Sequence, residues 1–185
     1  STISILSKDG YTKLSMKRVA KEAGVSEATI FKYFEDKEDL IDKCYYRVGL
    51  EVVSQFEKDT QANNNLYDSL QHIARTNFLR LKSNQNIWDI FTHDINQRIR
   101  KNSQVYKCKK RYETLLTKLI VMAQKNKELI ASVNPRTILN MFFGPIEYIA
   151  IKYRMYGEDF DIDENVNDIV NTIFRAYSTK EDFKK

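Results

Sequence analysis

Apolar residues recur three and four positions apart along most of this chain, which is the spacing of one face of an α-helix. The most regular run lies near the C-terminal end, where six positions follow this period: Val166, Ile169, Val170, Ile173, Phe174 and Tyr177. No segment shows a convincing alternation of apolar and polar residues, which would indicate a strand. The pattern therefore predicts an all-α fold of about nine helices.

Composition supports long helices joined by short turns. The 185 residues include only 5 glycines and 2 prolines, the residues that most often interrupt regular structure. Hydrophobic residues make up 42% of the chain, enough for one sizeable core or two modest ones that share an interface. No stretch is apolar enough to span a bilayer, and the N-terminal residues lack the pattern of a secretory signal. We therefore expect a cytoplasmic protein with no membrane partner.

The region between Ser15 and Lys37 predicts two short helices joined by a tight turn. Ser15 can cap the first helix and Ser26 the second, while Gly24 supplies the turn between them. The apolar residues that would hold these helices in place are Met16, Val19, Ala20, Ala23, Val25, Ile30 and Phe34. This arrangement is typical of a helix-turn-helix, whose second helix lies in the major groove of DNA. A small helical hairpin within a bundle would show the same spacing.

Polar side chains stand where the second helix would face DNA. The candidates for contacts to bases or phosphates are Ser26, Thr29, Lys32 and Tyr33. The segment 13–34 carries five lysine and arginine residues against two glutamates. A small basic face of this kind is sufficient for a helix pair that docks on DNA.

The residues of this region closely resemble the TetR family of transcriptional regulators. The segments that carry the resemblance are Gly10-Tyr11, the run from Ser15 to Phe34 with its Ala23-Gly24-Val25-Ser26 turn, and Lys37-Glu38-Asp39-Leu40. The resemblance implies a three-helix DNA-binding domain at 1–45, followed by a helical domain at 46–185 that binds an effector and forms a homodimer. Only nine residues precede Gly10, whereas the family's first helix usually starts earlier, which leaves open that an upstream segment is absent.

The resemblance also implies roles for individual residues. Thr29 and Lys32 would lie toward bases or nearby phosphates, and Tyr33 toward the DNA backbone. Lys37, at the start of the next helix, would bind a phosphate. Phe31 stands where the family often has tyrosine, so a hydroxyl contact to phosphate is expected to be missing there. The complete set of expected DNA-binding residues is Ser15, Lys17, Ser26, Thr29, Lys32, Tyr33 and Lys37.

The middle helices are expected to enclose the effector pocket. The residues that could line it are Phe78, Trp88, Phe91, Tyr112, Leu116, Phe142 and Tyr148. For each of them, plain packing in the core is the alternative interpretation. The resemblance implies a small hydrophobic effector, which the sequence does not identify.

The last two helices, expected at about 134–156 and 163–177, would pair with those of a second copy in a four-helix bundle. The expected interface residues are Phe143, Ile169, Ile173 and Phe174. The alternative is that these helices complete a monomeric core.

The resemblance implies a repressor on a palindromic operator. Effector binding would favour a dimer whose second helices are wrongly spaced for successive major grooves, with the helix at 37–58 linking the two domains. A DNA-bound adaptor with the same fold but no small-molecule sensing is the alternative.

Basic residues are concentrated in the middle of the chain. Residues 75–128 carry 13 lysine and arginine residues against 4 aspartates and glutamates, with a dense tract at 98–111. A solvated face is the simplest interpretation of this tract. The other interpretations are attraction of an anionic effector such as an acyl thioester of coenzyme A, an acidic partner, or weak nonspecific contact with DNA.

Residues for catalysis are scarce. The two histidines are His72 and His93, and His93-Asp94 formally resembles the metal-dependent HD phosphohydrolases, but two histidines are few for a full ligand set. We expect no enzyme, no catalytic residue, no metal and no cofactor. Cys44 and Cys108 are expected to be reduced and packed, with a redox switch as the alternative.

Overall fold

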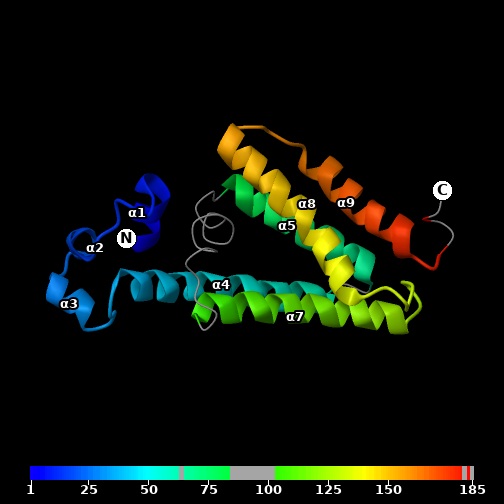
Figure 1. Ribbon diagram of the computed structural model, residues 1–185, viewed down its shortest axis with the longest axis horizontal. Helices are drawn as coiled ribbons and strands as arrows, with labels where there is room; N and C mark the ends of the chain where they lie inside the picture. Colours follow the sequence, from blue (N-terminus) through cyan, green and yellow to red (C-terminus); the bar gives the residue numbers. More distant parts are fainter. Residues whose placement is uncertain (63–64, 84–102, 181–182, 184–185) are drawn as a thin grey trace. The chain divides into compact units, whose positions relative to one another are not determined.

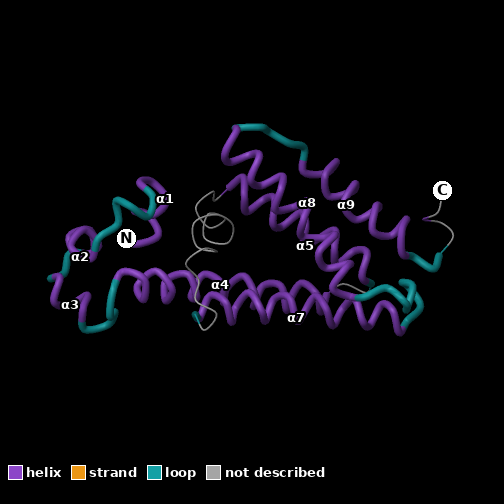
Figure 2. Tube along the Cα trace, viewed as in Figure 1, coloured by secondary structure: helices purple, strands orange, loops and turns teal. Residues whose placement is uncertain are grey.

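The computed structural model describes residues 1–62, 65–83, 103–180 and 183 (Figure 1). Within these ranges the chain forms eight α-helices and no strand, and Figure 2 shows only helices and loops along the described trace. The helices are α1 (Thr2–Asp9), α2 (Met16–Ala23), α3 (Glu27–Phe31), α4 (Lys37–Ala62), α5 (Leu66–Ser83), α7 (Gln104–Lys125), α8 (Pro135–Tyr156) and α9 (Ile162–Tyr177). The predicted all-α fold is confirmed. The helix expected around 87–95 lies outside the described residues.

The chain divides into two compact units. The first comprises Ser1–Val52 with the described part of 84–109, and the second comprises 53–83 with 110–185. Both α4 and α7 contribute residues to each unit, so neither unit is one continuous stretch of chain. The boundary expected between residues 45 and 46 stays a prediction.

The first unit has a small apolar core. Its buried members are Ile5, Leu14, Met16, Val19, Ala20, Ile30, Leu40, Ile41, Tyr45 and Val105. The start of α7 is attached to α4 through Asp42, whose carboxylate accepts hydrogen bonds from the backbone amides of Gln104 and Val105 at 2.9 and 3.1 Å. Ala23 and Val25, which the apolar pattern assigns to this core, are exposed. They flank the Gly24 turn, where the chain leaves the core side of α2.

In the second unit, α5, α8 and α9 pack against one another (Figure 1). The apolar stripe of α9 faces α5 and α8, and its buried residues are Val166, Ile169, Val170, Ile173 and Phe174. The end of α9 is also tied to the turn after α7, because the Ile130 amide donates to the Tyr177 carbonyl oxygen at 2.8 Å. This unit therefore has its own core, distinct from that of the first unit.

The α8 helix continues through Gly144 and Pro145. A proline inside a helix leaves the carbonyl four residues earlier without its amide partner. Because Pro145 is exposed, water can hydrate this part of the backbone. Asn134 caps the start of α8 by accepting a hydrogen bond from the Arg136 amide at 2.9 Å, so the helix start is as expected.

Candidate nucleic-acid interface and effector cavity

The turn between α2 and α3 has the local geometry of a helix-turn-helix. Ser15 caps α2 by accepting a hydrogen bond from the Arg18 amide at 3.2 Å, and Ser26 caps α3 by accepting one from the Thr29 amide at 3.1 Å. Gly24 ends α2 with φ of 69°, a left-handed conformation that glycine adopts without steric cost. The Ser26 and Thr29 hydroxyl oxygens are also 2.8 Å apart. These four residues set the direction in which α3 leaves α2.

One side of α3 is anchored in the core and the other is open. Ile30 is buried, whereas Ala28, Phe31, Lys32 and Tyr33 are exposed. The helical geometry extends past Phe31, because the Lys32 amide donates to the Ala28 carbonyl oxygen at 3.3 Å. The expected contact residues Lys32 and Tyr33 therefore lie on an accessible turn of helix.

The lysines of this surface are available to an anion. In the described part of the chain, the side chains of Lys17, Lys21 and Lys32 are exposed and form no ion pair. Arg18 differs, because its guanidinium pairs with the carboxylates of Asp9 and Glu22. The hydrogen bond with Asp9 holds the pKa of Arg18 above its ordinary value. Arg18 thus connects α2 to the end of α1, while the three lysines keep their charges toward solvent.

Lys37, expected to bind a phosphate, is half-buried and already engaged. Its ammonium group donates to the Tyr11 carbonyl oxygen at 2.6 Å and lies 3.7 Å from the centre of the Tyr11 ring. The Tyr11 hydroxyl in turn donates to the Glu38 carboxylate. In this arrangement Lys37 holds the loop after α1 against the start of α4. The sequence motifs contain both residues but give no signal that they meet.

The expected pocket residues have different surroundings. Phe78, Leu116 and Phe142 are fully buried. Tyr148 is 63% exposed on α8 and therefore lines no interior cavity, contrary to expectation. Trp88 and Phe91 lie outside the described residues. Of the described candidates, Tyr112 borders a cavity.

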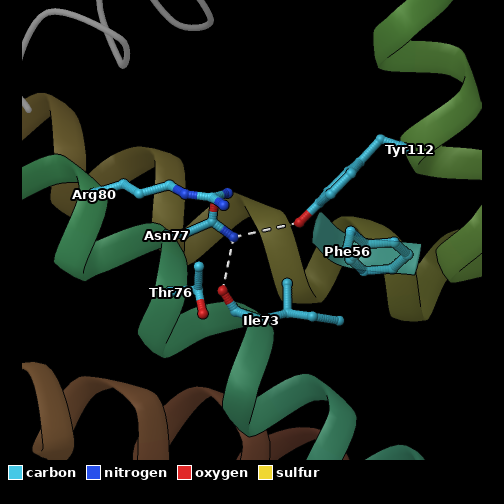
Figure 3. A pocket seen from close by; sticks show the side chains of 6 residues that line it. All are labelled: Phe56, Ile73, Thr76, Asn77, Arg80 and Tyr112. Carbon is cyan, nitrogen blue, oxygen red and sulfur yellow. Dashed lines mark hydrogen bonds between the residues drawn. The ribbon is translucent and has the colours of Figure 1, made fainter. Parts of the chain in front are cut away.

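That cavity lies between α4, α5 and α7, and all its lining residues belong to the second unit (Figure 3). Its lining residues are Phe56, Ile73, Thr76, Asn77, Arg80 and Tyr112. The Tyr112 ring packs on Phe56 with 4.6 Å between centroids, and the Asn77 amide donates to the Ile73 carbonyl oxygen at 2.8 Å. The same amide is 3.5 Å from the Tyr112 hydroxyl. The space within it is about 10 Å³, close to the minimum needed for one water molecule.

Sequence reasoning missed five of these six residues. The available signal was Asn77, an amide within the otherwise apolar α5 face formed by Leu66, Leu70, Ile73 and Leu81. A polar residue in such a face requires a partner when buried, which marks it as a candidate for a functional cavity.

The expected dimer residues on α9 are covered within the single chain. Ile169, Ile173 and Phe174 are all buried against α5 and α8, which leaves them little surface to offer a second copy. Phe143 is half-buried, with its ring 5.8 Å from that of Tyr112. This burial does not favour an interface role for the three α9 residues. Large apolar side chains are exposed instead on α8, namely Tyr148, Met155 and Tyr156.

The described part of the basic tract is partly neutralised. Lys110 pairs with Glu113 at 2.9 Å, and Arg111 pairs with Glu57 at 2.7 Å, as a solvated face would require. Residues 98–102 lie outside the described residues. An open groove of about 620 Å³ continues along α7 toward the start of α8. Its basic lining residues are Lys110, Lys118, Lys125 and Arg136.

The remaining candidates for chemistry are metal ligands and thiols. Among the described residues, no three His, Cys, Asp or Glu side chains gather as metal ligands, and His93 lies outside them. Burial raises the pKa of the Cys44 thiol, which disfavours the reactive thiolate form. Cys108 is a buried free thiol. No helix in the described ranges is long and apolar enough to cross a membrane.

Two family models match the chain. The model for bacterial regulatory proteins of the tetR family covers residues 1–44, and the model for the C-terminal region of YsiA-like proteins covers residues 47–176. The fatty acid metabolism regulator protein of Bacillus subtilis is 19% identical over 181 residues, which are 97% of this chain and 93% of that protein.

Solved structures show the same fold. FadR from Bacillus subtilis, in complex with stearoyl-CoA, matches with a TM-score of 0.83 at 19% identity and 94% coverage of both chains. AibR, in complex with isovaleryl coenzyme A and operator DNA, matches with a TM-score of 0.71 at 18% identity and 93% coverage of both chains. The matched proteins are regulators, so a metal-dependent phosphohydrolase is not favoured. The chain belongs to the TetR family of bacterial regulatory proteins and is a DNA-binding transcriptional regulator.

Proposed function

We propose that this protein represses transcription from a palindromic operator and is released when an acyl thioester of coenzyme A binds its second unit. Relatives with the same fold support this effector class, since FadR was solved with stearoyl-CoA and AibR with isovaleryl coenzyme A. The basic residues along α7 are compatible with a ligand that carries phosphates.

The chemistry of the cavity carries the proposal. Its wall combines the apolar side chains of Phe56 and Ile73 with the polar groups of Thr76, Asn77 and Tyr112 (Figure 3). A site of this kind suits a ligand with an apolar chain and a carbonyl oxygen, because the chain displaces water while the amide and hydroxyl orient the polar end. The present space is too small for such a chain, so binding requires the wall to move apart.

The long α4 helix provides the route from effector to DNA. Phe56 belongs to the cavity wall, and the same helix begins at Lys37 next to α3 in sequence. A ligand that displaces Phe56 would favour a different position of α4. If this state binds operator less tightly, the effector lowers operator affinity by the ratio of its own affinities for the two states.

The exposed face of α8 is the proposed dimer surface. Tyr148 and Met155 are 63% and 53% exposed and lie seven positions apart, on the same side of the helix. Exposed apolar side chains that recur on one face commonly mark a protein interface. A two-fold dimer would place two copies of α3 on a palindromic site.

The expected DNA-binding residues are proposed to have two roles. The serine caps and Thr29 orient α3, while Lys17, Lys32 and Tyr33 reach DNA from exposed positions. Lys37 would act mainly by holding the start of α4, and could reach a phosphate only by leaving Tyr11.

Fluorescence anisotropy on DNA from upstream of the protein's own coding region tests the proposal. We expect tighter binding to this DNA than to a scrambled fragment at the same salt concentration, with loss of binding when palmitoyl-CoA is added. Coenzyme A alone and palmitate serve as matched controls for the two halves of the effector.

Cavity variants separate effector binding from DNA binding. Asn77→Leu and Tyr112→Phe should retain operator affinity and require a higher concentration of palmitoyl-CoA for release. Operator binding that no acyl-CoA chain length affects would contradict the effector proposal and favour the adaptor alternative. Equal binding to specific and scrambled DNA would point to a target elsewhere, which selection from random DNA would identify.

A further inference from the structure

The exposed side of α3 contains an apolar patch. Phe31 is 50% exposed, and Ala28, three positions earlier, is also exposed. Residues three apart on a helix are neighbours on its surface. Because Ile30 occupies the core side of this helix, the pair formed by Ala28 and Phe31 faces away from the core.

The neighbours of this patch are polar. Lys32 follows Phe31 on the same exposed turn, and Glu27 precedes Ala28 at the helix start. Exposing a phenylalanine ring to water is unfavourable in free energy, because the ring is apolar. In the described part of the chain, Phe31 stacks on no other aromatic ring. Its position is explained if the ring becomes covered when α3 contacts DNA.

The major groove offers one common apolar group, the 5-methyl group of thymine. Phosphates, amino groups and carbonyl oxygens provide the other contacts there, and none of them suits a ring without a hydroxyl. We propose that Phe31, together with the Ala28 methyl group, contacts thymine methyl groups in the operator and so selects thymine at those positions. This inference rests on the proposed placement of α3 on DNA.

Deoxyuridine lacks only this methyl group, so it isolates the contact. A preferred duplex would first be obtained by selection from random DNA with the wild-type protein. Each thymine of that duplex is then replaced by deoxyuridine, and affinity is measured by anisotropy at fixed salt. We expect about a fourfold loss at the contacted positions, since a buried methyl or methylene group is worth about 0.8 kcal/mol.

Two variants complete the comparison. Phe31→Ala should bind the thymine and deoxyuridine duplexes equally at the position that Phe31 contacts, while a position contacted by the Ala28 methyl group alone keeps its discrimination. Phe31→Tyr retains the ring and should keep the discrimination. Phe31→Ala removes an exposed side chain, so its circular dichroism spectrum and Tm should match those of the wild type.

The outcomes distinguish this inference from the proposal on which it rests. If selection yields no preferred sequence, the proposal of operator binding and the proposal of the methyl contact are both contradicted. If a preferred sequence emerges but deoxyuridine has no effect at any position, the methyl contact alone is overturned. If Phe31→Ala still distinguishes thymine from deoxyuridine by the wild-type factor at every discriminating position, another residue makes the contact and the assignment to Phe31 is wrong.

Discussion

The ammonium group of Lys37 lies 3.7 Å from the centre of the Tyr11 ring and donates a hydrogen bond to the Tyr11 carbonyl oxygen at 2.6 Å. The two residues are 26 positions apart and belong to opposite ends of the DNA-binding region. Since the Tyr11 hydroxyl also bonds to Glu38, the loop after α1 is attached to the first turn of α4 at three points. The helix-turn-helix between them is thereby held in place.

Replacing Lys37 should cost stability. Lys37→Met removes the cation–π contact and the charged hydrogen bond, and we expect the free energy of unfolding in urea to fall by about 1–2 kcal/mol. Lys32→Met is the matched control, because Lys32 is exposed and unpaired in the described part of the chain, and should change stability by less than about 0.5 kcal/mol. Equal effects of the two substitutions would argue against a structural role for Lys37.

Lys32 should contribute charge to DNA binding. Lys32→Met is expected to weaken operator and nonspecific binding together, and to reduce the slope of log affinity against log salt by about 1 if one phosphate contact is lost. Lys125→Met, an exposed lysine on α7, is the control and should leave the slope unchanged. A loss confined to one operator sequence, with an unchanged slope, would indicate that Lys32 contacts a base instead.

The α8 face should determine the oligomeric state. Tyr148→Glu combined with Met155→Glu places two carboxylates on the proposed interface, and sedimentation should show a shift from dimer to monomer. Met122→Glu tests an equally accessible apolar residue on α7, where Met122 is 57% exposed, and should leave the dimer intact. A dimer that survives the double substitution would place the interface elsewhere.

Acid should weaken the first unit through Asp39. Burial acts to raise the pKa of Asp39, but hydrogen bonds from the Lys43 ammonium and the Glu35 amide outweigh it and lower that pKa below its ordinary value. A depressed carboxyl pKa stabilises the fold at neutral pH, and this stabilisation is lost as pH falls below about 4.

Thermal unfolding from pH 7 to pH 3 provides the measurement. Asp39→Asn should lower the Tm at pH 7. The difference in Tm between the variant and the wild type should become smaller toward pH 3. Asp168→Asn, an exposed carboxylate on α9, is the control and should follow the wild-type profile. A constant difference between Asp39→Asn and the wild type across this range would contradict the prediction.

The DNA-binding region could be predicted closely because its signals are local. Ser15 and Ser26 each cap a helix through an amide three residues further along the chain, and Gly24 ends α2 in a left-handed conformation. Such features depend on residues within about one helical turn, so their spacing in the sequence is their spacing in space. The exposed positions of Lys32 and Tyr33 follow from the same turn of helix.

For the later helices, the sequence predicts which residues share a face. It does not predict which segment packs against that face. The apolar stripe of α9 was expected to meet a second copy, and α5 and α8 of its own chain cover it instead. Tyr148 was expected inside and lies outside. A helical period identifies which residues share a face, while the choice of neighbour depends on contacts between segments far apart in the chain.

The cavity illustrates the same division. Phe56, Asn77 and Tyr112 come from three helices, and no spacing in the sequence relates them. The amino-acid pattern determined the helices, their caps and the exposed residues of α3, since these depend on neighbours along the chain. Packing between distant helices decided which apolar faces became core, which polar groups meet in a cavity, and which apolar side chains of α8 stay exposed.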